Sequence, residues 1–168
     1  MTDRNSKARR PWVAVVVAAV LVTGVLSGCT VNGTASAPEA EVAAYKSQQL
    51  IKRQKANAMS TCMTVSVTLA GSSAAYNRYI AALNAQNPDP KLATDVVNRF
   101  NSDVEYLRKA STEELPDDLK EQLKVLADTR ETQSRTVASK NIQGLNAAAD
   151  RMNQGRAKLN DVCRGYLP

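Results

Sequence analysis

The strongest constraint on the fold is a run of large apolar residues spaced four, four, four and three positions apart. They are Leu92, Val96, Phe100, Val104 and Leu107. Because an α-helix has about 3.6 residues per turn, side chains at this spacing lie on one face of a helix. Such a helix is stable mainly through the packing of that face against another element. The run therefore predicts an amphipathic helix inside a larger helical assembly.

Turn signals divide the rest of the chain into further helices. Asn87-Pro88-Asp89-Pro90 predicts a stop and a restart, since Asp89 can cap a helix that begins at Pro90. Pro116, followed by two aspartates, predicts a second start. A last helix is expected, with apolar residues from Ile142 to Val162 and an end at Gly165. We therefore predict an all-α fold, an up-and-down bundle of four to five helices over residues 39–168.

Three stretches fit the helical pattern less well. Residues 63–69 alternate between apolar and polar, as a strand does, but no other stretch alternates and a lone strand leaves its hydrogen bonds unmade. We expect residues 59–86 to be helical, with a break at Gly71-Ser72-Ser73 as an option. Residues 130–136 are polar all round. Gly144 and Gly155 fall inside the last helix, where each either weakens it by about 1 kcal/mol or permits close helix contact.

The first 28 residues have the organisation of a secretory signal peptide. Four basic residues lie within the first ten positions, and an apolar run, Trp12–Leu26, follows them. An uncleaved transmembrane anchor is the alternative. A span needs roughly 20 apolar residues, however, and Thr23 and Gly24 interrupt this shorter run. Both interpretations place the body of the protein outside the cytoplasm.

The run ends at Leu26-Ser27-Gly28-Cys29, which resembles the lipobox of bacterial lipoproteins, of an actinobacterial type. In that family the cysteine sulfur receives a diacylglyceryl group, and cleavage before the cysteine makes it the new N-terminus. The resemblance implies a signal peptide over 1–28, and a lipidated N-terminus with a flexible tether over 29–38. It also implies that Cys29 holds the protein at the cell membrane, on the extracytoplasmic face.

Processing at Cys29 halves the net charge. The whole chain is +6, with 22 Lys and Arg against 16 Asp and Glu, whereas residues 29–168 carry 18 against 15, a net of +3. The high positive charge is the main argument for a nucleic-acid partner, and processing removes half of it. Lys46, Lys52, Arg53 and Lys55 form a basic segment near the anchor. It either faces anionic headgroups or is a solvated helix face, and we favour the second because its cations point in several directions.

Two cysteines, Cys62 and Cys163, remain once Cys29 is assigned to lipid. Outside the cytoplasm, an even remainder predicts a disulfide, which would close a loop of about a hundred residues. Two buried thiols that behave as small apolar residues are the alternative.

The sequence contains few of the residue combinations that form active sites. The chain has no histidine, and the acid pairs Glu113-Glu114 and Asp117-Asp118 are better explained by the helix dipole than by catalysis. We therefore expect no enzyme activity, no cofactor and no metal site.

The predicted function is a membrane-anchored, non-catalytic interaction module for an envelope protein or polymer. The alternative is a carrier of an apolar ligand, which would need a cavity of roughly 300 Å³. The residues expected to line it are Met59, Leu69, Ile80 and Met152. We expect a closed core instead.

Overall fold

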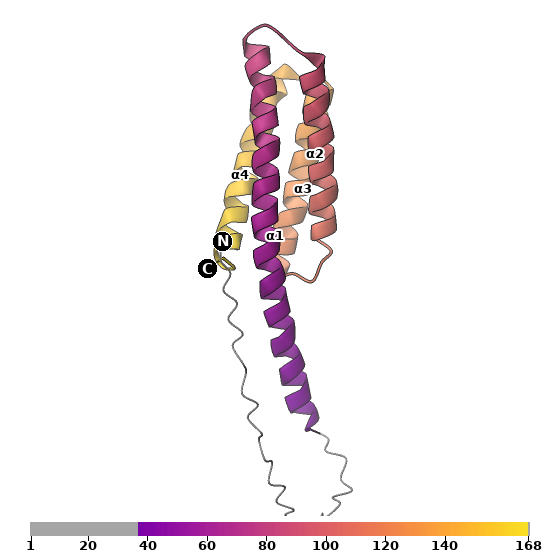
Figure 1. Cartoon of the computed structure of the whole chain (residues 1–168), viewed down its shortest axis with the longest axis vertical. Coiled ribbons are helices and arrows are strands. Elements are labelled where there is room, and N and C mark those ends of the chain that lie inside the picture. The colour runs from indigo at the N-terminus through magenta and orange to yellow at the C-terminus, as the bar shows by residue number, and fades with distance from the viewer. Residues whose placement is uncertain (1–36, 168) are drawn as a thin grey trace, which may run out of the picture. The chain divides into compact units, whose positions relative to one another are not determined.

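The computed structural model describes residues 37–167, which form a bundle of four α-helices (Figure 1). The helices are α1 (Glu39–Asn84), α2 (Pro90–Ala110), α3 (Asp117–Ala138) and α4 (Leu145–Arg164), with a 3₁₀ turn, η1 (Ile142–Gly144), directly before α4. The predicted all-α bundle is thus confirmed, with four helices among the described residues. The predicted signal peptide, Cys29 and residues 30–36 lie outside the described residues.

The helix boundaries follow the turn signals of the sequence. The Asp89 side chain accepts a hydrogen bond of 2.8 Å from the backbone N–H of Lys91, and Pro90 is the first residue of α2. Pro116 directly precedes α3, whose first turn carries two aspartates that favour the helix dipole. Gln86 adopts a left-handed conformation, with φ of 54°, just after α1 ends.

α1 is one continuous helix of 46 residues, which confirms the helix expected from residue 59 onward, and the optional break at Gly71-Ser72-Ser73 is absent. The hydroxyls of both serines donate to backbone carbonyls four residues earlier, at 3.2 and 2.8 Å, so both are hydrogen-bonded within the helix. Glycine costs a helix only about 1 kcal/mol. Leu69 and Tyr76, on either side of it, are buried in the bundle and hold the helix together. Packing therefore outweighs the local breaker.

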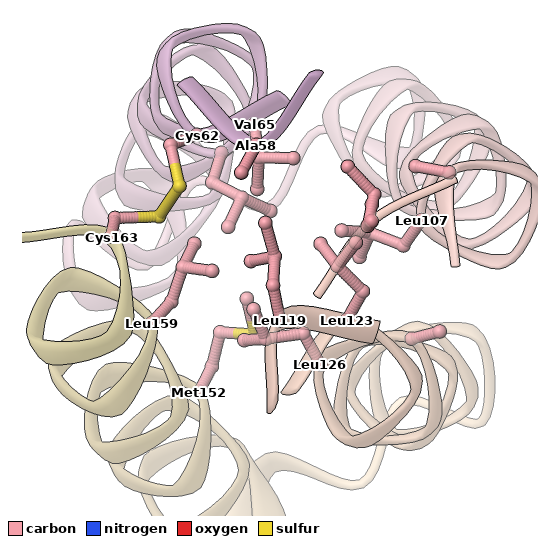
Figure 2. Packing of buried hydrophobic residues seen from close by; sticks show 14 residues of the cluster. Ala58, Cys62, Val65, Leu107, Leu119, Leu123, Leu126, Met152, Leu159 and Cys163 are labelled. Carbon is pink, nitrogen blue, oxygen red and sulfur yellow. A yellow bond between two sulfur atoms is a disulfide. The ribbon is translucent and has the colours of Figure 1, made fainter. Parts of the chain in front are cut away.

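The core consists of two clusters of buried apolar side chains. In the first, residues from all four helices converge around the leucines of α3 and the disulfide (Figure 2). The second contains Phe100 and Val96 of the predicted α2 face, together with Tyr76 and Val137. α3 packs closely against both α2 and α4, whereas α1 contacts mainly α2.

The two glycines assigned to the last helix have different roles. Gly144 lies at the end of η1, before α4, so its assignment to the helix interior is wrong. Gly155 is buried in α4, and a Cβ there would lie 3.0 Å from a methyl carbon of Leu126 on α3. Gly155 therefore permits a close approach of α3 and α4.

The N-terminal part of α1 extends beyond the other three helices (Figure 1). At about 1.5 Å per residue, residues 39–52 reach roughly 20 Å past the bundle. Their side chains are exposed except for the partly buried Gln49. Among the described helices, none is both long enough and apolar enough to cross a membrane.

Candidate functional site

The outward face of α1 carries a row of exposed apolar side chains, which we call the α1 stripe. Met59, Met63 and Val67 are its large members, 40%, 58% and 74% exposed. Successive members lie three or four residues apart, so they share one helix face: Ala56, Met59, Met63, Val67, Ala70 and Ala74. Rows with this spacing are the surfaces on which partner helices pack.

An open groove runs beside the stripe, between α1 and α2. It has a volume of about 610 Å³ and is bordered by Val67 and Gly71 on α1 and by Asp95, Arg99 and Ser102 on α2. The apolar α1 stripe therefore lies next to a groove whose α2 side is polar and charged.

The predicted basic segment divides into two parts. Arg53 forms an ion pair with Glu114, in the α2–α3 connection, at 3.1 Å between Nη2 and Oε1. This contact marks the level at which α1 leaves the bundle. Lys46, Lys52 and Lys55 are exposed on α1. Lys46 and Arg53 border one open hollow on α1 that Lys52 and Lys55 do not line, so the four cations do not share a single face.

The predicted disulfide is present. Cys62 on α1 and Cys163 on α4 are bonded, with their Cα atoms 5.7 Å apart and 101 residues between them in sequence (Figure 2). Both residues are buried. Because α1 makes few other contacts with α4, the bond fastens the two helices where packing alone is sparse.

A buried ion pair lies at the middle of the bundle. The Arg130 Nε atom of α3 is 3.1 Å from Oδ2 of Asp103 on α2, and the side chains are 1% and 4% exposed. Asp103 also accepts a 2.9 Å hydrogen bond from the Ser72 hydroxyl, and Arg130 Nη1 donates to the Gln133 amide oxygen at 2.6 Å. The guanidinium carbon stands 4.2 Å from the centre of the Phe100 ring. This network joins three helices.

Burial shifts the titration of both members of the pair. It lowers the pKa of Arg130 to about 10, an effect that the Asp103 carboxylate opposes and the guanidinium of Arg156 strengthens. Burial also raises the pKa of Asp103, against the opposing effects of Arg130 and the Ser72 hydroxyl. Arg130 therefore remains charged at neutral pH, deep inside the domain.

A small cavity opens between α1, α3 and α4 beside this pair. Its volume is about 200 Å³, and Arg130 forms part of its wall. Arg156 of α4 also lines it and donates a 3.0 Å hydrogen bond to the Ser73 hydroxyl of α1. Asn77 and Asn153, both exposed, complete its polar rim. Two cationic side chains thus line one partly open cavity.

Comparison with known protein families matches residues 44–164 to the Rv2240c four-helix bundle domain. This chain belongs to that family. Searches of the curated proteins and of the solved structures give no match. The matched segment contains most of α1 and all of α2 and α3, and it ends with α4 at Arg164.

The Rv2240c bundle domain contains every predicted site residue except the lipidation site. The disulfide and the basic segment lie within the match, whereas Cys29 precedes it and lies outside the described residues. Among the described residues, no group of three or more Cys, Asp or Glu side chains is placed to hold a metal ion.

The buried polar network was not predicted from the sequence. Residues 130–136 have polar side chains on every face of the helix, yet Arg130, Gln133 and Ser134 are buried. A signal was available, because Arg130 lies four residues after Leu126 and so continues the apolar face of α3. Asp103 interrupts the apolar face of α2 in the same way. Charged residues at core positions are seldom buried unless they are paired.

Proposed function

We propose that this chain is a lipid-anchored, extracytoplasmic, non-catalytic interaction module of the cell envelope. The α1 stripe carries the proposal, because Met59, Met63 and Val67 leave apolar surface in water along one helix face. Methionine is over-used at surfaces that bind other proteins, since its flexible thioether adapts to a partner. Such a surface favours a docking role for the bundle.

The occupant that fits the stripe best is an amphipathic helix of an envelope protein. A second helix would lay its apolar face along the stripe, as helices do in coiled coils and grooves. Residues 42–84 of α1 contain no Asp or Glu, and Lys52 and Lys55 flank the N-terminal end of the stripe. Charge complementarity therefore favours a partner helix with acidic flanks.

The lipid anchor at Cys29 is the second part of the proposal. The lipobox resemblance supports it, and α1 begins ten residues after Cys29. The two acyl chains of a diacylglyceryl cysteine give stable membrane attachment, whereas a single chain gives only marginal binding. The projecting end of α1 would then act as a rigid spacer between the membrane and the stripe.

A closed core favours the module over an apolar-ligand carrier. The four residues expected around a carrier cavity do not meet, because Met59 is exposed while Leu69 and Met152 pack in the first cluster. Ile80 packs against the second cluster. A mainly apolar hollow of about 310 Å³ lies elsewhere, beside Tyr79, Leu83 and Ile142, and none of the four expected residues lines it.

The test compares charge substitutions on and off the stripe. Met63→Glu places a carboxylate in the middle of the stripe, and Val125→Glu places one at a 42% exposed apolar position on α3. Both proteins are expressed at full length, cross-linked through a photoreactive residue at Ala70, and extracted from their own membranes for mass spectrometry.

We expect one discrete protein adduct, retained with Val125→Glu and lost with Met63→Glu, while circular dichroism stays unchanged. An adduct insensitive to Met63→Glu would contradict the stripe as the docking surface. A product of twice the chain mass would identify a second copy as the occupant and refute the heterologous helix.

A further inference from the structure

We propose that the cavity between α1, α3 and α4 binds the oxyanion group of a small ligand, a phosphate or a carboxylate, between Arg130 and Arg156. This site is separate from the α1 stripe, so the proposal stands or falls independently of the docking function. It concerns a ligand of different chemistry, held inside the bundle rather than along its outer face.

The charge balance at the cavity favours an anion. Arg130 and Arg156 both line it, and the remaining lining residues are neutral. Among residues 37–167, Asp103 is the one carboxylate in contact with Arg130, and it lies near Nε and is not part of the cavity wall. An anion placed between the two guanidinium groups would relieve their mutual repulsion in a setting of reduced dielectric.

The hydrogen bonding of Arg130 is incomplete without such a ligand. Nη1 donates to Gln133, whereas Nε and Nη2, both buried, have no hydrogen-bond partner among the described residues; Nε lies 3.1 Å from Oδ2 of Asp103 as an ion pair, and that oxygen also accepts no hydrogen bond there. A buried donor left unpaired costs roughly 1–3 kcal/mol, and more when it is charged. Phosphate and carboxylate oxygens are the acceptors that a guanidinium binds best, often through two parallel hydrogen bonds.

A purely structural role explains the buried arginine less well. Replacing a buried ion pair by apolar side chains of similar volume is often neutral or stabilising. A core position that continues the face of Leu126 would therefore be filled at least as well by leucine or methionine. An arginine that is 1% exposed and reaches the wall of a cavity is accounted for more simply by a charged ligand.

The size and rim of the cavity set the class of ligand. Its volume of about 200 Å³ lies below the range of roughly 300–1,000 Å³ that holds drug-sized molecules. The space therefore suits an oxyanion with only a few further atoms. Asn77 and Asn153 at the rim offer neutral donors and acceptors to the rest of such a ligand.

Isothermal titration calorimetry on the full mature protein in an uncharged detergent tests the site. The probes are inorganic phosphate and acetate, titrated separately so that the two oxyanions are distinguished. We expect saturable binding of one of them at a single site, with Kd below about 1 mM. Arg156→Gln and Asn153→Asp should each weaken it about tenfold or more, since one removes a cation and the other adds an anion.

Arg151→Gln is the matched control, because Arg151 is an exposed arginine of α4 outside the cavity wall. It should bind the probe as the unsubstituted protein does. Arg156 is only partly buried, so its variant should keep the fold, which circular dichroism checks. Absence of saturable binding for both probes overturns the proposal. Binding that survives Arg156→Gln and Asn153→Asp unchanged also overturns it.

Discussion

Removing the disulfide tests how the bundle holds its longest helix. The perturbation is the double substitution Cys62→Ala and Cys163→Ala. The bond closes a loop with a sequence separation of 101 residues. For a loop of that length the chain-entropy model gives a stabilisation of about 4.7 kcal/mol. A single domain has roughly 5–15 kcal/mol of stability in all. The variant should therefore lose a large part of its free energy of unfolding.

Beyond this global loss, α1 should also open locally. α3 packs closely against α2 and α4, whereas α1 contacts α4 sparsely apart from the bond. Without the cross-link, the segment of α1 around Cys62 should open more often than α3 does. Hydrogen exchange measured by mass spectrometry should show lower protection at residues 58–69 than in the unsubstituted protein, with a smaller change over residues 119–127.

The assay is urea unfolding followed by circular dichroism. We expect the double variant to lose about 3–5 kcal/mol relative to the oxidised protein. The control is the unsubstituted protein, unfolded and refolded under reducing conditions, which keeps both sulfur atoms but removes the bond. It should lose slightly less than the variant, because the core contacts of Cys62 and Cys163 remain. A loss below about 1 kcal/mol for both proteins would refute the reasoning.

Three further results are expected. Asp103→Asn should lower the free energy of unfolding in urea by about 3–5 kcal/mol, since it leaves the Arg130 charge buried without its counter-charge. The double variant Asp103→Leu, Arg130→Met should recover most of that loss. Gly71→Ala should raise the free energy of unfolding by about 1 kcal/mol, because nothing lies within 4 Å of the Cβ position. Gly155→Ala should lower it by about 1 kcal/mol through overpacking against α3. Equal changes in the two variants would contradict the close packing at Gly155. Burial and a hydrogen bond to a carboxylate raise the pKa of Tyr166 to about 12, so Tyr166→Phe should remove a step near pH 12 from the ultraviolet titration.

The same tyrosine sets an alkaline limit on stability. Its folded pKa of about 12 exceeds the ordinary value of 10.0, so the folded state binds more protons between these two pH values. The corresponding stability is fully present below pH 10 and is lost as the pH rises through 12. The hydroxyl donates to Asp118 at 2.9 Å, which fastens the C-terminal end to the start of α3.

Much of the fold could be predicted from local signals. The Asp89-Pro90 start and the apolar face of α2 follow from residue chemistry at fixed spacing. The pairing of Cys62 with Cys163 follows from the two cysteines that remain once the lipobox resemblance assigns Cys29 to lipid. The uninterrupted course of α1 through Gly71 could not be predicted in this way. It depends on the packing of residues before and after the glycine against other helices, a contribution that local helix propensity does not contain.

The candidate sites were harder to find in the sequence. A face of α1 becomes a stripe only once the bundle has left it uncovered, and Met59 fitted the core pattern equally well before the packing was known. Arg130 and Arg156 lie on different helices, so the cavity between them arises from tertiary structure alone. The position of Arg130 on the apolar face of α3 was the single local indication.

The intact mass of the protein extracted from its own membranes tests the anchored-module account most directly. The account predicts a chain that begins at Cys29, with its mass increased by a diacylglyceryl group on that residue. Cys29→Ala should abolish that increase and leave the larger precursor. A membrane-extracted protein that retains residues 1–28, or that is cleaved without added lipid, would contradict it.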